Sequence, residues 1–306
     1  MSEQQDVSRT VEPAAPTTEV QSNNRTFKPY ALENSLKRYG GDKWGQGFIA
    51  VNGEGHIEFR APGLPDVDLH KLVLMLRERG VHTPLVVRFP SMIVASMQRL
   101  HDAFDAAAKE LEFGGRHVGM YPLKVNQRRS VVETVVQARE QCGYGLEAGS
   151  KPELLLAMAQ PVYAGAPLIC NGFKDREFIR LAYHAAELGH EVVVVLESLR
   201  EVRRYLEVSE EQDWAATPLV GMRAKLYSRG SGKWQSSGGE LSKFGLTTNE
   251  MLEVVRQLEA AGKVDKLGLL HFHIGSQITQ IKRIKTAVRE GARIWGALRA
   301  RCPGLE

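Results

Sequence analysis

From residue 84 onward, short apolar runs of the β-strand type alternate with helical segments. These runs begin at Pro84, His117, Tyr144, Leu168, Val192, Leu219 and Leu267. Between them, apolar residues recur every three or four positions, the spacing of an amphipathic helix, as in Ile93, Met97, Leu100, Phe104 and Leu111. Short, almost continuous apolar strands separated by helices predict a parallel sheet that is covered by helices.

Seven strand–helix units in series favour a (β/α)8 TIM-type barrel over an open doubly wound sheet. A closed barrel of this type needs eight strands, but the seventh helical segment already reaches the end of the sequence at Glu306. We therefore expect an α/β protein whose barrel is incomplete and whose chain is cut before the eighth strand.

Three regions differ in composition. Residues 1–25 are rich in Ser, Thr, Glu, Gln and Pro, and a segment with so few large apolar residues is expected to be a disordered tail. Within residues 26–80, two short apolar runs flank Asn52 and Gly53, which predicts a β-hairpin followed by a lead-in helix. The barrel is expected over residues 81–306.

Overall composition is that of an ordinary globular protein, with 43% hydrophobic residues, 25% charged residues and a net charge of +4. No apolar stretch is long enough to cross a bilayer, and the first residues lack the apolar core of a signal peptide. We expect a cytoplasmic protein with no membrane and no nucleic-acid partner, since its densest basic run, 282–285, suits a solvated helix face. The three cysteines are widely spaced and predict neither a disulfide framework nor a metal site.

In barrels of this type, active-site groups follow the carboxyl ends of the strands, and Lys124 is placed in that way. A lysine in the barrel mouth loses part of its hydration, which lowers its pKa and frees a neutral amine for a Schiff base. The alternative is a lysine whose charged end simply reaches solvent. Position alone leaves both interpretations open.

A second group of candidates follows the last apolar run. His273 is followed by Ile-Gly-Ser, so Gly275 allows the backbone to approach a phosphate closely and Ser276 can donate hydrogen bonds to it. His271 lies two residues earlier and faces the same side of a strand. A zinc-binding pair or two ordinary core histidines are the alternatives, although no neighbouring acid or cysteine completes a metal site.

Glu147 and Arg223 are charged residues at expected strand ends, where an unpaired buried charge is costly. They predict either a structural ion pair across the barrel, or contacts between Arg223 and a cofactor oxygen or Glu147. A glycine-rich segment, residues 228–240, follows Arg223 and is long for a loop of this kind, which suggests a binding loop or a disordered one.

Several of these segments resemble the biosynthetic arginine decarboxylases, pyridoxal-phosphate-dependent enzymes of the alanine-racemase-like fold related to ornithine and diaminopimelate decarboxylases. The resembling runs are YPLKVNQ, GLEAGSKPELLLAM, CNGFKDREFI, VVVVLESLREV, GMRAKLYSRGSGKWQSSGGELSKFGL and HFHIGSQI, in order from about Tyr39 to the end. The resemblance implies that Lys124 is the Schiff-base lysine, that His273 stacks on the cofactor ring and that Ser276 binds its phosphate. It also places Glu147 and Arg223 beside the cofactor, and Lys243-Phe244-Gly245 near a subunit contact.

The activity that the resemblance implies is decarboxylation of L-arginine to agmatine and carbon dioxide, within putrescine and spermidine biosynthesis. It also implies a homo-oligomer in the full-length form and Mg2+ as a further cofactor, for which no ligand cluster stands out here. The glycine-rich phosphate loop, the substrate-binding acids and a C-terminal β-domain of that family are absent from these residues, so we expect a fragment with little activity alone. Ornithine or diaminopimelate as substrate, a non-catalytic binding protein and a Schiff-base aldolase are the alternatives.

Overall fold

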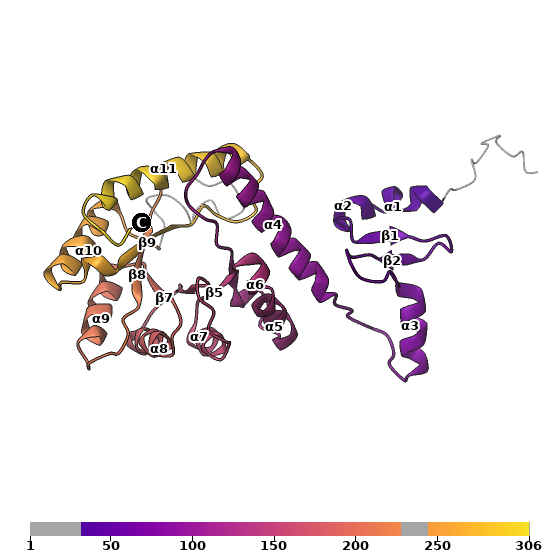
Figure 1. Ribbon diagram of the computed structural model, residues 1–306, viewed down its shortest axis with the longest axis horizontal. Coiled ribbons are helices and arrows are strands. Elements are labelled where there is room, and N and C mark those ends of the chain that lie inside the picture. Colours follow the sequence, from indigo (N-terminus) through magenta and orange to yellow (C-terminus); the bar gives the residue numbers. More distant parts are fainter. Residues whose placement is uncertain (1–31, 228–243, 306) are drawn as a thin grey trace, which may run out of the picture. The chain divides into compact units, whose positions relative to one another are not determined.

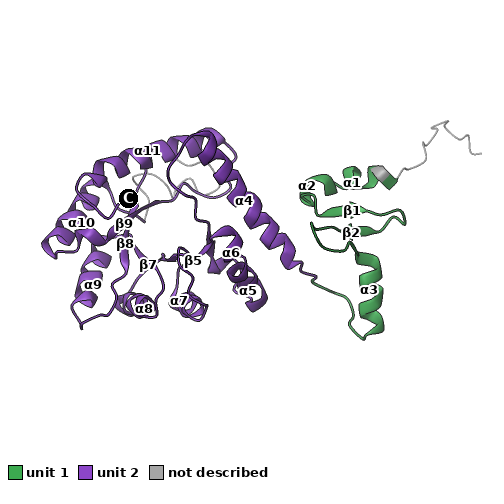
Figure 2. Cartoon of the chain, viewed as in Figure 1, with its two compact units in different colours: residues 1–86 green, residues 87–306 purple. Residues whose placement is uncertain are grey.

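The computed structural model describes residues 32–227 and 244–305, and the chain divides into two compact units, Met1–Val86 and Val87–Glu306 (Figure 2). The predicted tail, residues 1–25, and the glycine-rich segment, residues 228–240, lie outside the described residues. Each unit is described below by itself.

Unit 1 contains a three-stranded antiparallel sheet in the order β1-β2-β3 and short helices beside it. Its elements are η1 (Leu32–Asn34), α1 (Ser35–Arg38), α2 (Gly41–Trp44), β1 (Ile49–Val51), β2 (Ile57–Phe59), β3 (Val67–Asp68) and α3 (Leu69–Glu78). The predicted hairpin is confirmed, because Ile49 pairs with Phe59 and Val51 with Ile57. A hydrogen bond closes the turn between these strands: the backbone N–H of Asn52 donates to the backbone carbonyl of His56 at 3.0 Å.

Unit 2 is a curved parallel sheet with helices along its outer face (Figure 1). Its first half contains α4 (Pro90–Glu110), β4 (Met120–Pro122), η2 (Leu123–Val125), α5 (Arg129–Gln137), α6 (Arg139–Cys142), β5 (Gly145–Ala148), α7 (Lys151–Met158), β6 (Leu168–Cys170) and α8 (Arg176–Glu187). Its second half contains β7 (Val192–Leu196), α9 (Leu199–Ser209), β8 (Leu219–Ala224), α10 (Thr248–Ala260), η4 (Val264–Lys266), β9 (Leu267–Phe272) and α11 (Ile281–Arg299). The expected α/β class with a parallel sheet is confirmed.

The number of strands was predicted incorrectly. Within residues 87–227 and 244–305, six strands pair in the order β4-β5-β6-β7-β8-β9, whereas the sequence predicted seven. The run that begins at Pro84 forms no strand: Pro84 has no N–H to donate to a ladder, and Val86 is 76% exposed. The strand expected from His117 begins three residues later, at Met120.

The core of unit 2 lies between the sheet and its helices. Every residue of β7 is buried, and Phe178 and Ile179 of α8 pack with Val202 and Tyr205 of α9 in the same apolar cluster. The helices before and after β7 are strongly amphipathic, and each turns one apolar face toward the strands. This explains the cluster.

Helix caps fix the turns that follow the strands. Asp175 begins α8 and Ser198 begins α9, and each side chain accepts a hydrogen bond from an amide of the first helical turn. Thr247 and Glu250 form a reciprocal capping box at the start of α10. Since such caps satisfy amides that the helix leaves unpaired, they hold the start of each helix close to the preceding strand end.

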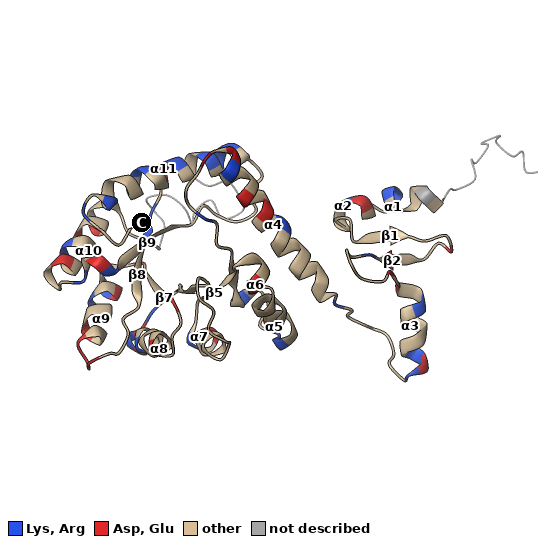
Figure 3. Ribbon diagram, viewed as in Figure 1, with Lys and Arg blue, Asp and Glu red and all other residues tan. Residues whose placement is uncertain are grey.

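Charged residues are distributed unevenly between the helices and the sheet. Lysine, arginine and acidic residues gather on the helices, whereas the strands are largely uncharged (Figure 3). Among the described residues, no helix is both long and apolar enough to cross a membrane. The few charged groups on strands or at their ends therefore stand out from the rest of the sheet.

Packing around β7 leads to a stability prediction. Val194→Ala removes two methyl groups from a fully buried position, so we expect the free energy of unfolding to fall by about 2 kcal/mol. Val288→Ala, at a position on α11 that is 52% exposed, should change it by less than about 0.5 kcal/mol. Urea denaturation followed by circular dichroism measures both, and equal losses would contradict the assignment of β7 to the core.

Candidate active site

Four of the five predicted site residues lie at the carboxyl ends of strands. Lys124 lies in η2 directly after β4, Glu147 is in β5, Arg223 is in β8 and His273 follows β9. Parallel pairing brings these ends to one edge of the sheet, since Pro122 pairs with Glu147 and Arg223 with His271.

Lys124 and Glu147 are neighbours at this edge. Burial raises the pKa of the Glu147 carboxyl, and the positive charge of Lys124 opposes that shift. Lys124 is exposed, as in the alternative of a lysine whose charged end reaches solvent, and partial loss of its hydration stays a prediction. Lys124 lies in η2, two residues after the end of β4.

Arg223 pairs with a residue that the sequence analysis did not select. Its Nη1 donates to Glu197 Oε1 at 2.8 Å, and both side chains are largely buried. The ion pair that the structure shows for Arg223 is therefore with Glu197, and a contact between Arg223 and a cofactor oxygen or Glu147 stays a prediction. Glu197 directly follows the apolar run of β7, so the strand-end rule that selected Glu147 would also have found it.

A buried ion pair between the turn after β6 and the first turn of α9 was also missed. Lys174 follows β6, and its Nζ lies 3.3 Å from Glu201 Oε2, with both side chains almost completely buried. The sequence signal for Lys174 is its place four residues after β6. Glu201 lies within the first turn of a helix, where acidic residues are common, and carries no such signal.

The two histidines lie beside the Arg223 guanidinium. Burial is the main cause that lowers the pKa of His271 to about 4. The positive charges of Arg223, His273 and Lys174 lower it further in the same direction. Partial burial and the charges of Arg223 and Lys124 also lower the pKa of His273. Both imidazoles are therefore neutral near pH 7, which suits a ring that stacks on an electron-poor aromatic group.

Ser276 lies three residues beyond His273 and is exposed, and among the described residues no hydrogen bond joins its side chain to the other four. Gly275 just before it has a φ of 102° and open space where a side chain would begin. This backbone conformation favours glycine and leaves room for a ligand at the loop.

The chemistry of this edge fits pyridoxal phosphate. It offers an exposed amine for an aldehyde, neutral imidazoles for an aromatic ring and a fixed guanidinium for anionic oxygens. In addition, His271 Nδ1 and Asn171 Oδ1 are buried without a hydrogen-bond partner among the described residues. Unsatisfied polar atoms of this kind are rare in folded proteins and occur where a ligand or water completes the site.

Comparison with known proteins supports the same cofactor. Residues 96–301 match the family described as "Pyridoxal-dependent decarboxylase, pyridoxal binding domain". The chain belongs to this family. The chain is 43% identical over 271 residues to the biosynthetic arginine decarboxylase of Gloeobacter violaceus. This alignment covers 88% of this chain and 42% of the relative.

Solved structures of family members agree with the fold. The biosynthetic arginine decarboxylase SpeA from Campylobacter jejuni is 36% identical, with a TM-score of 0.77, over 88% of this chain and 42% of that chain. Diaminopimelate decarboxylase from M. jannaschii matches with a TM-score of 0.60 at 20% identity over 86% of this chain and 56% of that chain, which shows the fold alone. The chain thus spans less than half the length of the biosynthetic arginine decarboxylases from Gloeobacter violaceus and Campylobacter jejuni.

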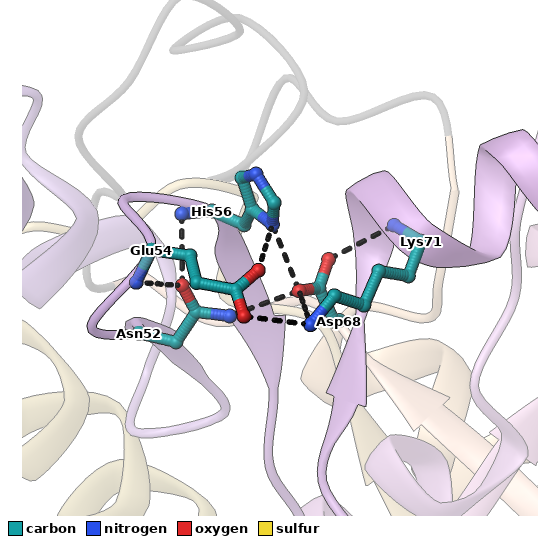
Figure 4. Close-up of polar contacts among 5 residues, drawn as sticks. All are labelled: Asn52, Glu54, His56, Asp68 and Lys71. Atoms are coloured by element: carbon teal, nitrogen blue, oxygen red, sulfur yellow. Dashed lines mark hydrogen bonds and ion pairs between the residues drawn. The ribbon is translucent and has the colours of Figure 1, made fainter.

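A separate polar cluster lies in unit 1 (Figure 4). Glu54, His56 and Asp68 place possible metal-ligating atoms within 4.8 Å of one another, and His56 Nδ1 lies 2.9 Å from Asp68 Oδ2. The Lys71 ammonium already pairs with Glu54 at 2.9 Å, and Asp68 Oδ1 accepts from the Lys71 amide at 3.0 Å. Lys71 thus compensates part of the negative charge of the two carboxylates, and the contacts join the hairpin to the start of α3.

The cluster in unit 1 predicts a pH dependence. Partial burial opposes a low pKa for Asp68, but hydrogen bonds from Lys71, His56 and Asn52 outweigh it and hold that pKa well below its usual range. The stabilisation is therefore present above the usual carboxyl pKa of about 4 and is lost as the pH falls below it.

Asp68→Asn keeps a helix-capping side chain but removes this charge, so it should flatten the loss of unit 1 stability in acid. Hydrogen exchange of the hairpin amides, measured from roughly pH 6 to pH 3, tests this. Asp66→Asn, at a carboxylate that is 50% exposed, is the matched control and should leave the profile unchanged. An acid profile of Asp68→Asn identical to that of the unchanged protein would contradict the prediction.

The histidines at the sheet edge give a second pH prediction. NMR titration should place His271 near a pKa of 4 and His273 below its ordinary value. Arg223→Met removes a positive charge that acts on both rings, so both pKa values should rise. Arg256→Met, at an exposed arginine on α10, should leave both titrations unchanged, and unchanged values in Arg223→Met would contradict the placement of the guanidinium.

Proposed function

We propose that this chain is the pyridoxal-binding part of an enzyme that decarboxylates L-arginine to agmatine and carbon dioxide, in putrescine and spermidine biosynthesis. The observation that carries the proposal is the set of Lys124, Glu147, Arg223 and His273 at one edge of a parallel sheet. Support for arginine as the substrate comes from relatives that are named biosynthetic arginine decarboxylases.

In this proposal each residue has a distinct task. Lys124 would hold the cofactor through its aldehyde, and the side chain of Lys124 is exposed and free to reach the ligand. His273 packs against the cofactor ring as a neutral imidazole, and Arg223 faces an anionic oxygen with its orientation fixed by Glu197. Ser276, next to the open backbone at Gly275, donates to the phosphate.

When bound, pyridoxal phosphate supplies a sink for the electrons that remain after a carboxylate leaves. Glu147 lies beside Lys124, and its raised pKa makes it suited to hold a proton close to the reacting amine. The protein thus orients the ligand and places charge around it.

Three finer expectations from the family resemblance belong to the same proposal. They are Mg2+ as an additional cofactor, a homo-oligomer of the full-length protein and a cytoplasmic location. We also propose that residues 26–80 form a segment of their own and that the barrel spans residues 81–306. Ornithine or diaminopimelate as substrate is the alternative within the family, and a non-catalytic binding protein is the alternative outside it.

The test uses cofactor attachment rather than turnover. Adding pyridoxal phosphate to the chain should produce a visible absorbance band, and borohydride reduction should then fix the cofactor on the peptide that contains Lys124. Lys124→Ala should abolish both signals because it removes the amine. Lys109→Ala, at an exposed lysine on α4, is the control and should retain them.

A band that survives Lys124→Ala would show that another amine binds the cofactor, and the proposal would fail. If Lys124 does bind it, comparing the spectral change on adding arginine, ornithine or diaminopimelate would test the substrate. A response to ornithine that exceeds the response to arginine would favour the alternative substrate.

A further inference from the structure

The Glu201 carboxylate is the meeting point of two strand-end turns. Its Oε1 accepts from the backbone N–H of Lys174 at 3.0 Å, and its Oε2 accepts from the backbone N–H of Glu197 at 2.8 Å. The Lys174 ammonium lies 3.3 Å from the same Oε2 and also donates to the Gly172 carbonyl. One side chain in the first turn of α9 therefore holds the turns after both β6 and β7.

The same contacts continue to Arg223. The amide that Glu201 binds belongs to Glu197, and the side chain of Glu197 accepts from Arg223 Nη1 at 2.8 Å. The conformation of the Glu197 backbone sets where its carboxylate lies, and that carboxylate holds Nη1 of the guanidinium, which also lies over the Phe244 ring, 5.7 Å from its centroid. Glu201 thus acts on Arg223 through one intermediate residue.

Burial makes this arrangement stiff. Lys174 is 0% exposed and Glu201 is 3% exposed, so neither charge can exchange its partner for water. A charge-assisted hydrogen bond in such surroundings is short-ranged and directional, and losing one partner leaves the other charge uncompensated. The turn at Glu197 has little freedom while Glu201 is intact.

We propose that Glu201 is a positioning residue that holds the Arg223 guanidinium at the pyridoxal site by fixing the Glu197 turn. The cofactor part of this inference rests on the proposed function, in which Arg223 faces an anionic oxygen of the cofactor. The competing explanation is that Glu201 only balances Lys174 and stabilises the fold.

The two explanations differ in whether the effect of Glu201 passes through Arg223. Glu201→Gln should weaken pyridoxal phosphate binding about tenfold, the lower end of the effect when a residue that orients a metal ligand is lost. Arg223→Met should weaken it by a similar factor, and adding Glu201→Gln to Arg223→Met should cause little further loss. Titration of the visible band measures each affinity.

A second measurement does not need the cofactor. His273 is the probe, because Arg223 and Lys124 lower its pKa, whereas Lys174 also acts on His271 and would confuse that signal. Glu201→Gln should raise the pKa of His273 toward its value in Arg223→Met, because the guanidinium is no longer held nearby. In the Arg223→Met background, Glu201→Gln should not change it.

The variants are chosen so that folding does not decide the result. Lys174→Met combined with Glu201→Gln removes both buried charges together, which preserves the fold better than removing one. Glu259→Gln is the control: it breaks the partly exposed ion pair between Glu259, in the last turn of α10, and Arg301, beyond the end of α11, and should change neither readout.

The inference is overturned if Glu201→Gln and the paired variant leave the His273 pKa at its original value. It is also overturned if Glu201→Gln weakens cofactor binding equally with and without Arg223. If the unchanged protein binds no pyridoxal phosphate, the proposed function fails, and the His273 titration still decides whether Glu201 positions Arg223.

Discussion

The parallel pairing of β4 through β9 is the constraint on which the site depends. Because every strand runs in the same direction, residues far apart in sequence reach the same edge of the sheet, as Lys124 and His273 do. A shift of one residue in any pair would turn the side chain at that strand end to the other face. Apolar burial of β7 on both faces secures this register at the centre of the sheet.

Charge at this edge is arranged in two ways. Lys124 and His273 are exposed and available to a ligand, whereas Arg223, Glu197, Lys174 and Glu201 are held in ion pairs that are largely or fully buried. A buried ion pair contributes little net stability, since the loss of hydration offsets the attraction between the charges. Such pairs fix directions instead, and here they fix the turns that carry the guanidinium.

The sequence predicted the class of fold better than its details. Apolar periodicity identified the strands that pair, but it also predicted a strand from Pro84, where Val86 remains exposed. On α4 the predicted apolar stripe is buried at Met97, while Leu100 and Phe104 are about half exposed. Periodicity shows which side of an element is apolar, but it does not show whether another element covers that side.

By itself, the sequence determined the α/β class, the hairpin and the strand-end position of Lys124, Glu147, Arg223 and His273. These follow from local spacing, because the apolar period of a segment and the place where it ends depend on neighbouring residues. Tertiary structure alone decided that Arg223 pairs with Glu197, that Lys124 is exposed, and that Glu201 joins two turns. Those facts depend on distances between segments about 25 or more residues apart, which the folded chain sets and local spacing does not.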